Sequence, residues 1–332
     1  SCPICGGGDW LPAVSAAAIG TEASNRDRFI RTRLRRKASG AELKDLTDFM
    51  HDTSADLVRC TGCGVMLRDE PEVRSAASYE EDPNDPDLMQ HVYGRYVQAF
   101  RNKEAAFRDR LPPGASVLEI GSHLGSFLQV GEEWNWRPVG IDPGYDTSAF
   151  AREQGLTVVR ETIDDARVRS GSADAVFIWN CFEQLTDPAR ALRRSREFLR
   201  PGGLLILRVP NVDFYLRHRM EKPLWLAWNN LLGFPYLFGY DSRTLNRLAE
   251  NFGFLPVAGF NSELVTMPFA DPSWAVTAEQ KSNSEEVGRW SSCTALRDGT
   301  LHGPWIEGVY RKREETERRR VQPSPLFLPR AA

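Results

Sequence analysis

Two short cysteine motifs constrain the N-terminal part of this chain. They read Cys2-Pro3-Ile4-Cys5-Gly6 and Cys60-Thr61-Gly62-Cys63-Gly64. In such a turn both thiolates face one point, and the glycine permits the positive φ that closes the turn. Four thiolates form a soft, tetrahedral ligand set that suits zinc, with iron as a contaminant of overexpressed protein. The sequence therefore predicts structural zinc on Cys2, Cys5, Cys60 and Cys63, within a small zinc-ribbon-like module.

The alternatives for these cysteines are two disulfides or two redox dithiols. A reducing cytoplasm disfavours persistent disulfides, and a thioredoxin-like motif should accompany a βαβ unit, which this region lacks. Four thiolates leave no open coordination position, so the metal is expected to hold the fold rather than perform chemistry. Between the motifs, residues 28–37 and 41–51 have helical patterns, and Ser39 with Glu42 forms a capping box for the second.

From Gly114 onward, short apolar runs alternate with helical segments, the pattern of a parallel sheet with helices on both faces. A first strand over residues 116–121 runs into a turn and a helix start at residues 122–127. A second strand ends at Asp142, where a carboxylate can bind both hydroxyls of a ribose. A turn that binds a pyrophosphate needs glycines where this chain has Ser122 and His123, whose side chains crowd the turn. This favours a cofactor without phosphate.

Four ordered segments of the chain resemble the class I S-adenosylmethionine-dependent methyltransferases. These segments are residues 117–125, 140–143, 174–188 and 199–206. The resemblance covers roughly Tyr93 to Lys312, and N-termini with cysteine knuckles occur in that superfamily beside sugar and natural-product methyltransferases. It implies an α/β, Rossmann-like, seven-stranded sheet with helices on both faces and one antiparallel strand, whose last two strands fall at residues 257–260 and 306–311.

The resemblance also implies the cofactor contacts. Gly121 and Gly125 would shape the turn beneath the methionine part, Asp142 would hold the ribose, and Asn180 would face the methionine group. The adenine contacts would fall on Thr162 and Ile163, where the family has an acidic residue, so Asp164 or Asp165 is a substitute. The implied cofactor-binding set is Glu119, Gly121, Ser122, Gly125, Asp142, Pro143, Thr162, Ile163 and Asn180.

Methyl transfer is an in-line displacement, so the protein aligns the acceptor and, for a hydroxyl, removes a proton. The candidate catalytic residues are His123, Glu183 and Tyr93. Many relatives carry Glu-His where this chain has Glu183-Gln184, which removes one candidate base and leaves a structural role open for Glu183. Further along, an aromatic-rich segment over residues 214–240 predicts either a pocket wall or a small satellite core.

The composition and length of the chain indicate its binding partners, its location and its domain division. A formal net charge of -3 argues against a general affinity for nucleic acid, and the basic stretches at residues 26–37 and 311–320 are read as solvated helix faces. No apolar run approaches the roughly 18 residues of a membrane span, and no signal peptide is expected, so the predicted location is cytoplasmic. The 332 residues divide into a zinc module with a helical insertion (1–90), a methyltransferase domain (91–313) and a charged, proline-rich tail (314–332).

The resulting hypothesis is methyl transfer from S-adenosylmethionine to a small-molecule acceptor, either a sugar, a lipid or a secondary metabolite, on oxygen, nitrogen or carbon. One alternative is an RNA or protein methyltransferase in which the zinc module and residues 26–37 grip a macromolecule. Another is a non-catalytic scaffold that retains the fold. The sequence leaves the oligomeric state open.

Overall fold

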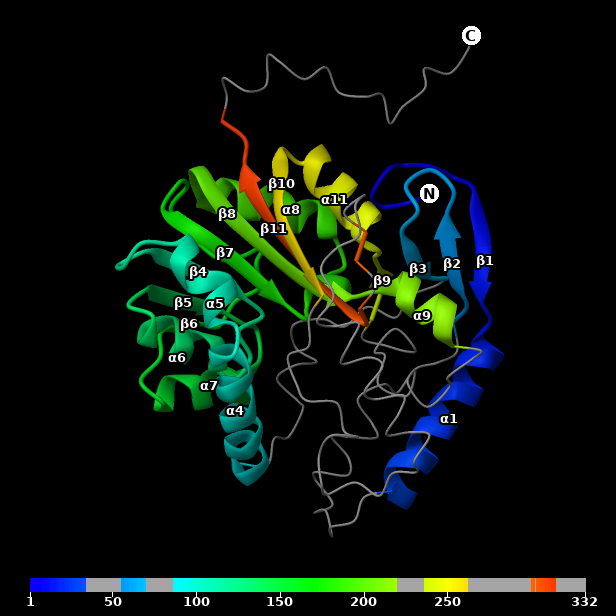
Figure 1. Cartoon of the computed structure of the whole chain (residues 1–332), viewed down its shortest axis with the longest axis horizontal. Coiled ribbons are helices and arrows are strands. Elements are labelled where there is room, and N and C mark those ends of the chain that lie inside the picture. The colour runs from blue at the N-terminus through cyan, green and yellow to red at the C-terminus, as the bar shows by residue number, and fades with distance from the viewer. Residues whose placement is uncertain (34–54, 70–85, 220–235, 262–299, 302, 315–332) are drawn as a thin grey trace.

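The structure is a computed structural model that describes residues 1–33, 55–69, 86–219, 236–261, 300–301 and 303–314. Its strands form two sheets, one of seven strands and one of four. Figure 1 shows the larger sheet in the centre and the smaller one beside the N-terminus.

The seven-stranded sheet has the order β10-β11-β8-β7-β4-β5-β6. Strands β6, β5, β4, β7 and β8 run parallel to one another, whereas β11 is antiparallel to both β8 and β10. This arrangement confirms the predicted Rossmann-like sheet with one antiparallel strand. The strands are β4 (Ser116–Ile120), β5 (Arg137–Ile141), β6 (Val158–Val159), β7 (Ala173–Trp179), β8 (Leu199–Pro210), β10 (Phe254–Asn261) and β11 (Trp305–Lys312).

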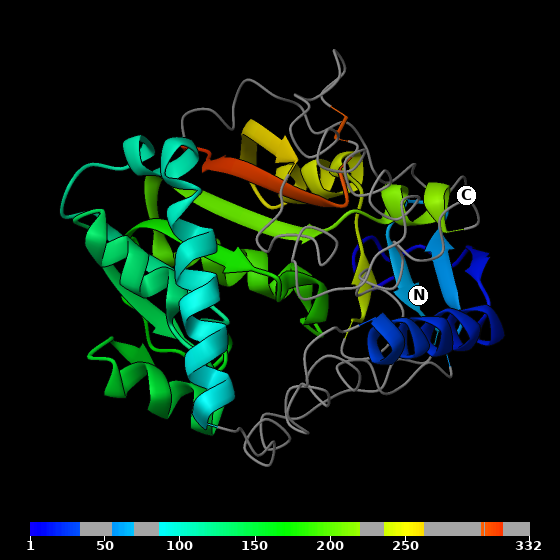
Figure 2. The same cartoon turned by 60° about the horizontal axis from the view of Figure 1, so that its bottom comes forward.

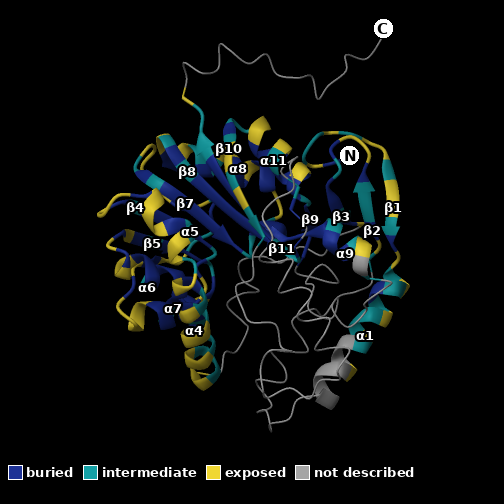
Figure 3. Ribbon diagram, viewed as in Figure 1, coloured by how far each residue is buried: buried dark blue, intermediate teal, exposed yellow. Residues whose placement is uncertain are grey.

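Helices cover both faces of this sheet, as predicted. Along β7, Phe177 and Trp179 join one buried cluster while Val176 and Ile178 join the other, because successive strand residues point to opposite faces. Figure 3 shows the resulting burial of the central strands. On the first face lie α4 (Pro86–Arg101), α5 (Glu104–Phe107), α6 (Ser126–Glu133) and α7 (Tyr145–Glu153), and on the second lie α8 (Pro188–Phe198) and α11 (Ser242–Asn251).

The four-stranded sheet has the order β1-β2-β3-β9 with antiparallel pairing throughout. Its strands are β1 (Trp10–Val14), β2 (Leu57–Cys60), β3 (Met66–Arg68) and β9 (Phe238–Gly239). The fourth strand therefore comes from the part of the chain that follows β8. Helix α1 (Ala16–Arg33) follows β1 and includes the start of the helix predicted at residues 28–37. The capping box at Ser39 and the helix at residues 41–51 lie outside the described residues.

The two cysteine motifs and the strands β1, β2 and β3, which we call the cysteine module, pack directly onto the larger sheet. Cys2, Cys60 and Cys63 belong to the same buried cluster as Phe182 and Tyr240. A separate small cluster joins Tyr236 to residues of β1, α1 and β3, whereas Phe238 and Tyr240 pack in the cluster of the larger sheet. The choice between a pocket wall and a satellite core for the aromatic-rich segment stays a prediction. Trp225, Trp228 and Phe234 of that segment lie outside the described residues. The division of the chain at residue 90, and the tail, stay predictions.

Side-chain caps fix the starts of the two helices on the second face. The Asp187 carboxylate accepts a hydrogen bond from the Arg190 amide at 2.8 Å at the start of α8. Asp241 accepts one from the Thr244 amide at 2.7 Å at the start of α11. Within the described part of the chain, no helix combines the length and apolar character that crossing a bilayer requires.

Candidate active site and metal centre

The turn between β4 and α6 lies at the carboxyl edge of the larger sheet. Gly121 and Gly125 have φ of +71° and +78°, and the Gly125 amide closes the turn on the Ser122 carbonyl at 2.8 Å. A Cβ on Gly121 would come within 2.6 Å of Cys181 Sγ, and one on Gly125 within 2.6 Å of Leu156 Cδ1. Both positions therefore require glycine for conformation and for space.

Asp142 is joined to this turn. Its side chain is nearly buried, and its Oδ2 accepts a hydrogen bond from the His123 amide at 2.7 Å. Its Oδ1 accepts bonds from the Gly144 amide at 2.9 Å and from Thr147 Oγ1 at 3.2 Å. The half-buried Pro143 leads from Asp142 toward α7. The structure thus brings the predicted glycine turn and the predicted ribose-binding carboxylate together.

Two buried polar atoms in this region lack a partner among the described residues. They are Glu119 Oε2 and Ser122 Oγ, on side chains that are 3% and 4% exposed. Burial raises the pKa of Glu119 well above its usual range, and the nearby charge of Asp142 adds to the effect. Buried polar groups are normally hydrogen-bonded, so these atoms fit a site that receives polar groups from a ligand.

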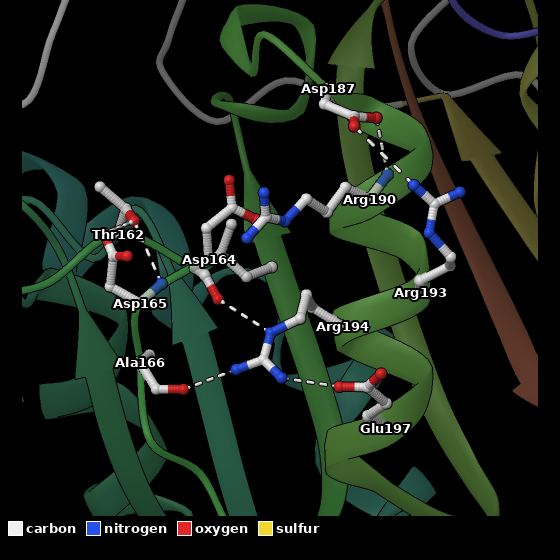
Figure 4. A network of polar contacts seen from close by, with 10 residues as sticks. Thr162, Asp164, Asp165, Ala166, Asp187, Arg190, Arg193, Arg194 and Glu197 are labelled. Atoms are coloured by element: carbon white, nitrogen blue, oxygen red, sulfur yellow. Dashed lines mark hydrogen bonds and ion pairs between the residues drawn. The ribbon is translucent and has the colours of Figure 1, made fainter.

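The loop after β6 carries the predicted adenine contacts. Thr162 Oγ1 donates to Asp165 Oδ2 at 2.7 Å, and Asp164 forms an ion pair with Arg190 of α8 at 2.8 Å. Arg194 of α8 donates to the Ile163 carbonyl at 3.3 Å and to the Ala166 carbonyl. Figure 4 shows how these contacts tie the loop to α8. Both carboxylates considered as adenine partners are thus engaged within the protein, and the roles of Thr162 and Ile163 stay predictions.

Asn180 follows β7 and belongs to a buried polar network. It has φ of +55°, and its side-chain oxygen accepts a hydrogen bond from Arg208 of β8. The Arg208 side chain is 2% exposed, lies 4.1 Å from the centre of the Trp305 ring, and pairs with Glu307 at 3.7 Å. Lys103 also forms an ion pair with Glu307.

Sequence reasoning missed this network. The available signal was a lone charged residue in an apolar strand: Arg208 interrupts the run Leu204 to Val209, and Glu307 interrupts the start of β11. A charged group in a buried strand requires a partner, so each of the two could have been recognised as half of a pair.

Glu183 lies on the one-turn helix η2 (Phe182–Gln184), which follows β7. Its side chain is fully buried, and neither carboxylate oxygen has a hydrogen-bond partner among the described residues. Burial raises the pKa of Glu183 to about 8, and the charge of Arg208 offsets this only in part. The Tyr240 ring lies 5.3 Å from the Phe182 ring, and its buried hydroxyl also lacks a described partner.

The other two candidate catalytic residues have different surroundings. Tyr93 of α4 is buried against α6, where its hydroxyl donates to Gln129 Oε1 at 3.3 Å and its carbonyl accepts from Ser126 Oγ at 3.2 Å. His123 is exposed within the glycine turn and has φ of +47°. His123 thus lies within the glycine turn, Tyr93 contacts the start of α6, and Glu183 lies after β7.

The four cysteines of the N-terminal motifs form one cluster. Their sulfur atoms all lie within 4.8 Å of one another, with Cys2 to Cys63 at 3.7 Å and Cys5 to Cys60 at 3.5 Å. A disulfide needs about 2.05 Å, whereas four sulfurs around a zinc ion at about 2.3 Å are ~3.8 Å apart. The four cysteines are free thiols, which agrees with the metal prediction and disagrees with the alternative of two disulfides.

The two motifs adopt matching turns around this cluster. The Gly6 amide donates to the Cys2 carbonyl at 2.8 Å, and the Gly64 amide donates to the Cys60 carbonyl at 2.9 Å. The two glycines have φ of +74° and +82°. The donor set and the turn geometry therefore fit a tetrahedral thiolate-bound metal.

The strand order, the glycine turn and the acidic residue after the second parallel strand define a class, that of the S-adenosylmethionine-dependent methyltransferases. The family model for the methyltransferase domain matches residues 89–258, just over half of the chain. The chain belongs to this family.

Relatives with curated names support the same class. The chain is 28% identical to the C-methyltransferase NovU of Streptomyces niveus over 63% of its own length and 47% of that protein. It is 31% identical to the trans-aconitate 2-methyltransferase of Deinococcus radiodurans over 36% of its own length and 46% of that protein. The chain spans about half the length of the curated relatives it matches.

A solved structure shares the fold. It is a chain from the complex between the Haloferax volcanii Trm112 methyltransferase activator and a methyltransferase, with a TM-score of 0.52. The sequence identity is 14%, and the match covers 68% of this chain and 93% of that chain.

Replacing Gly121 by alanine tests the crowding of the turn. Gly171→Ala is the matched control, because Gly171 also has positive φ, +68°, but has nothing within 4 Å of an added Cβ. We expect the control to lose about 1 kcal/mol of unfolding free energy and Gly121→Ala to lose roughly 1–3 kcal/mol more, measured by urea denaturation. Equal losses in the two variants would contradict the steric argument.

The pKa of Glu183 predicts a pH dependence of stability. A carboxyl pKa raised to about 8 means that the folded state keeps a proton which the unfolded state has already released. Wild-type stability should therefore fall relative to Glu183→Gln as the pH rises from about 5 to about 8, in denaturation series at each pH. The exposed Glu153, replaced in the same way, is the control and should show no such trend. A pH-independent difference between wild type and Glu183→Gln would contradict the assignment.

Proposed function

We propose that this chain transfers a methyl group from S-adenosylmethionine to a small-molecule acceptor. The observation that carries the proposal is a pair of buried atoms with no hydrogen-bond partner in the described part of the chain, Glu119 Oε2 and Ser122 Oγ, at a glycine turn that is hydrogen-bonded to Asp142. The curated relatives include a C-methyltransferase and a ubiquinone biosynthesis O-methyltransferase. Their printed names favour a small acceptor and leave the methylated atom open.

In this proposal each part of the carboxyl edge has its own task. The cofactor supplies a methyl group activated by a sulfonium. Gly121 and Gly125 let the backbone approach its methionine part, and Asp142, already oriented by the His123 and Gly144 amides, accepts from the ribose hydroxyls. The loop at Thr162 and Ile163 lies along the adenine, held in place by α8. Asn180 faces the methionine group.

Proton removal from the acceptor falls to Glu183 in this scheme. A general base is most effective when its pKa is near the operating pH, and burial raises the pKa of Glu183 to about 8. The Arg208 side chain holds Asn180 by a hydrogen bond and lies close enough to stabilise the charged form of Glu183. His123 and Tyr93 are proposed to orient the cofactor and acceptor from the opposite side of the glycine turn.

Titration with S-adenosylhomocysteine tests the cofactor site. We expect the full chain to bind it, and Asp142→Ala to weaken binding at least about tenfold, because a charge-assisted hydrogen bond contributes roughly 1.5–3 kcal/mol. Asp109→Ala, on an exposed residue of the 3-10 helix Arg108–Arg110, is the control and should bind as wild type does. A folded wild-type chain that does not bind the ligand in calorimetry would leave the scaffold alternative in place.

We also propose that Cys2, Cys5, Cys60 and Cys63 hold one structural zinc ion. Elemental analysis of purified protein should give one zinc per chain, and Cys60→Ser should reduce this content strongly, since a thiolate ligand is lost. Cys181→Ala is the control, because Cys181 lies against Gly121 rather than in the cluster, and it should retain the metal. A metal-free, folded wild-type protein would contradict this proposal.

A further inference from the structure

A short segment connects the cysteine module to the turn that carries Glu183. We call Leu237–Asp241 the bridge segment. Its strand β9 pairs with β3, as Figure 1 shows near the centre of the molecule, and the Arg68 amide donates to the Leu237 carbonyl at 3.2 Å. The Leu237 amide donates to the Glu183 carbonyl at 2.9 Å. The C=O of Leu237 thus binds the cysteine module, and its N–H binds the backbone of Glu183. A displacement of the module would therefore reach Glu183 through this one residue.

Arg59 fastens the other end of the bridge segment. Its Nε donates to the carbonyl of Gly64, in the turn of the second cysteine motif, at 3.1 Å. Its Nη2 pairs with Asp241 Oδ2 at 2.9 Å, while Asp241 Oδ1 caps α11. One guanidinium therefore spans a metal-binding turn and a helix cap. Lysine has a single nitrogen on a flexible stem and does not reproduce a two-point contact of this kind.

Apolar side chains also connect the cysteine module to the turn that carries Glu183. Phe182, next to Glu183, and Tyr240 of the bridge segment belong to one buried cluster with Cys2 and Cys63. Both rings are fully buried. Figure 2 shows the cysteine module and the main sheet on either side of this region. Because well-packed interiors transmit displacement, the cluster adds a side-chain route to the backbone one.

We propose that the bridge segment transmits metal loading of the cysteine cluster to the turn that carries Glu183, and that Arg59 is the positioning residue in this link. The proposal rests on the proposed roles of the cysteine cluster and of Glu183. The four thiolates hold the second motif in place when metal is bound, and this fixes Gly64 and with it the Arg59 contact to Asp241. When the metal is lost, the bridge segment and then the Glu183 turn become more open to exchange.

Hydrogen–deuterium exchange of the full zinc-loaded chain tests this link without needing an acceptor. In Arg59→Met, peptides that cover residues 237–241 and 182–184 should exchange about fivefold faster, as expected when a partly buried charged hydrogen bond is lost. Arg59→Lys should restore only part of the protection. Arg101→Met is the matched control, because Arg101 also pairs with a carboxylate, Glu133, on the far side of the sheet, and it should leave both peptides unchanged.

Removal of zinc with a chelator gives the second arm. It should accelerate the same two peptides, and the effects of zinc removal and of Arg59→Met should be less than additive, because both act on one path. Faster exchange of residues 237–241 with unchanged exchange of residues 182–184 would overturn the proposal, and so would fully additive effects. If circular dichroism shows that zinc removal unfolds the whole chain, the Arg59 variants alone decide.

Binding of S-adenosylhomocysteine is measured on the same samples. Affinity within about threefold of wild type shows that the main sheet of each variant is intact. Absence of binding to the wild type would end the proposed methyl transfer but would leave the exchange result valid. The two failures are therefore distinguishable.

Discussion

The hydrogen bonds between the ends of β4 and β5 are the contacts on which the candidate site depends. The Gly121 amide donates to the Ile141 carbonyl at 2.8 Å, and two residues later the His123 amide donates to the Asp142 carboxylate at 2.7 Å. Parallel pairing places both chain ends at one edge of the sheet, and an ionised acceptor strengthens the second bond. The glycine turn, the orientation of Asp142 and the start of α6 are therefore set together.

Buried ionisable groups gather at the carboxyl edge of the larger sheet. Among the described residues, Glu119 Oε2 and both carboxylate oxygens of Glu183 are buried without a hydrogen-bond partner, while the Arg208 and Glu307 side chains are buried but paired. Burial of ionisable groups costs free energy, and proteins concentrate such groups where function needs them. Glu119 lies on β4, the neighbour of β7, and Glu183 lies on η2, which follows β7 beyond Asn180.

The cysteine module is built into the molecule rather than appended to it. Its fourth strand is contributed by residues 238–239, and three of its cysteines pack in the core of the larger sheet. A metal ion held by the module would consequently stabilise contacts that reach the main sheet. Two cysteine motifs separated by 54 residues are therefore packed together against the sheet that carries the candidate site.

The sequence by itself determined the parts of this protein that depend on local pattern. Apolar runs marked several strands of the larger sheet, and the resemblance to the methyltransferases implied the full set of seven, but the two-residue strand β6 was not predicted. The glycines at positions 121 and 125 marked the turn, and the cysteine spacing predicted a four-thiolate cluster. Asp142 was predictable because the ends of adjacent parallel strands share an edge. The tertiary structure alone decided the Arg208–Glu307–Lys103 network, the Arg59–Asp241 pair and the two-residue strand β9. The ion pairs among these features join residues that are 99 to 204 positions apart in the chain, and no local periodicity encodes which distant side chain a buried charge will meet.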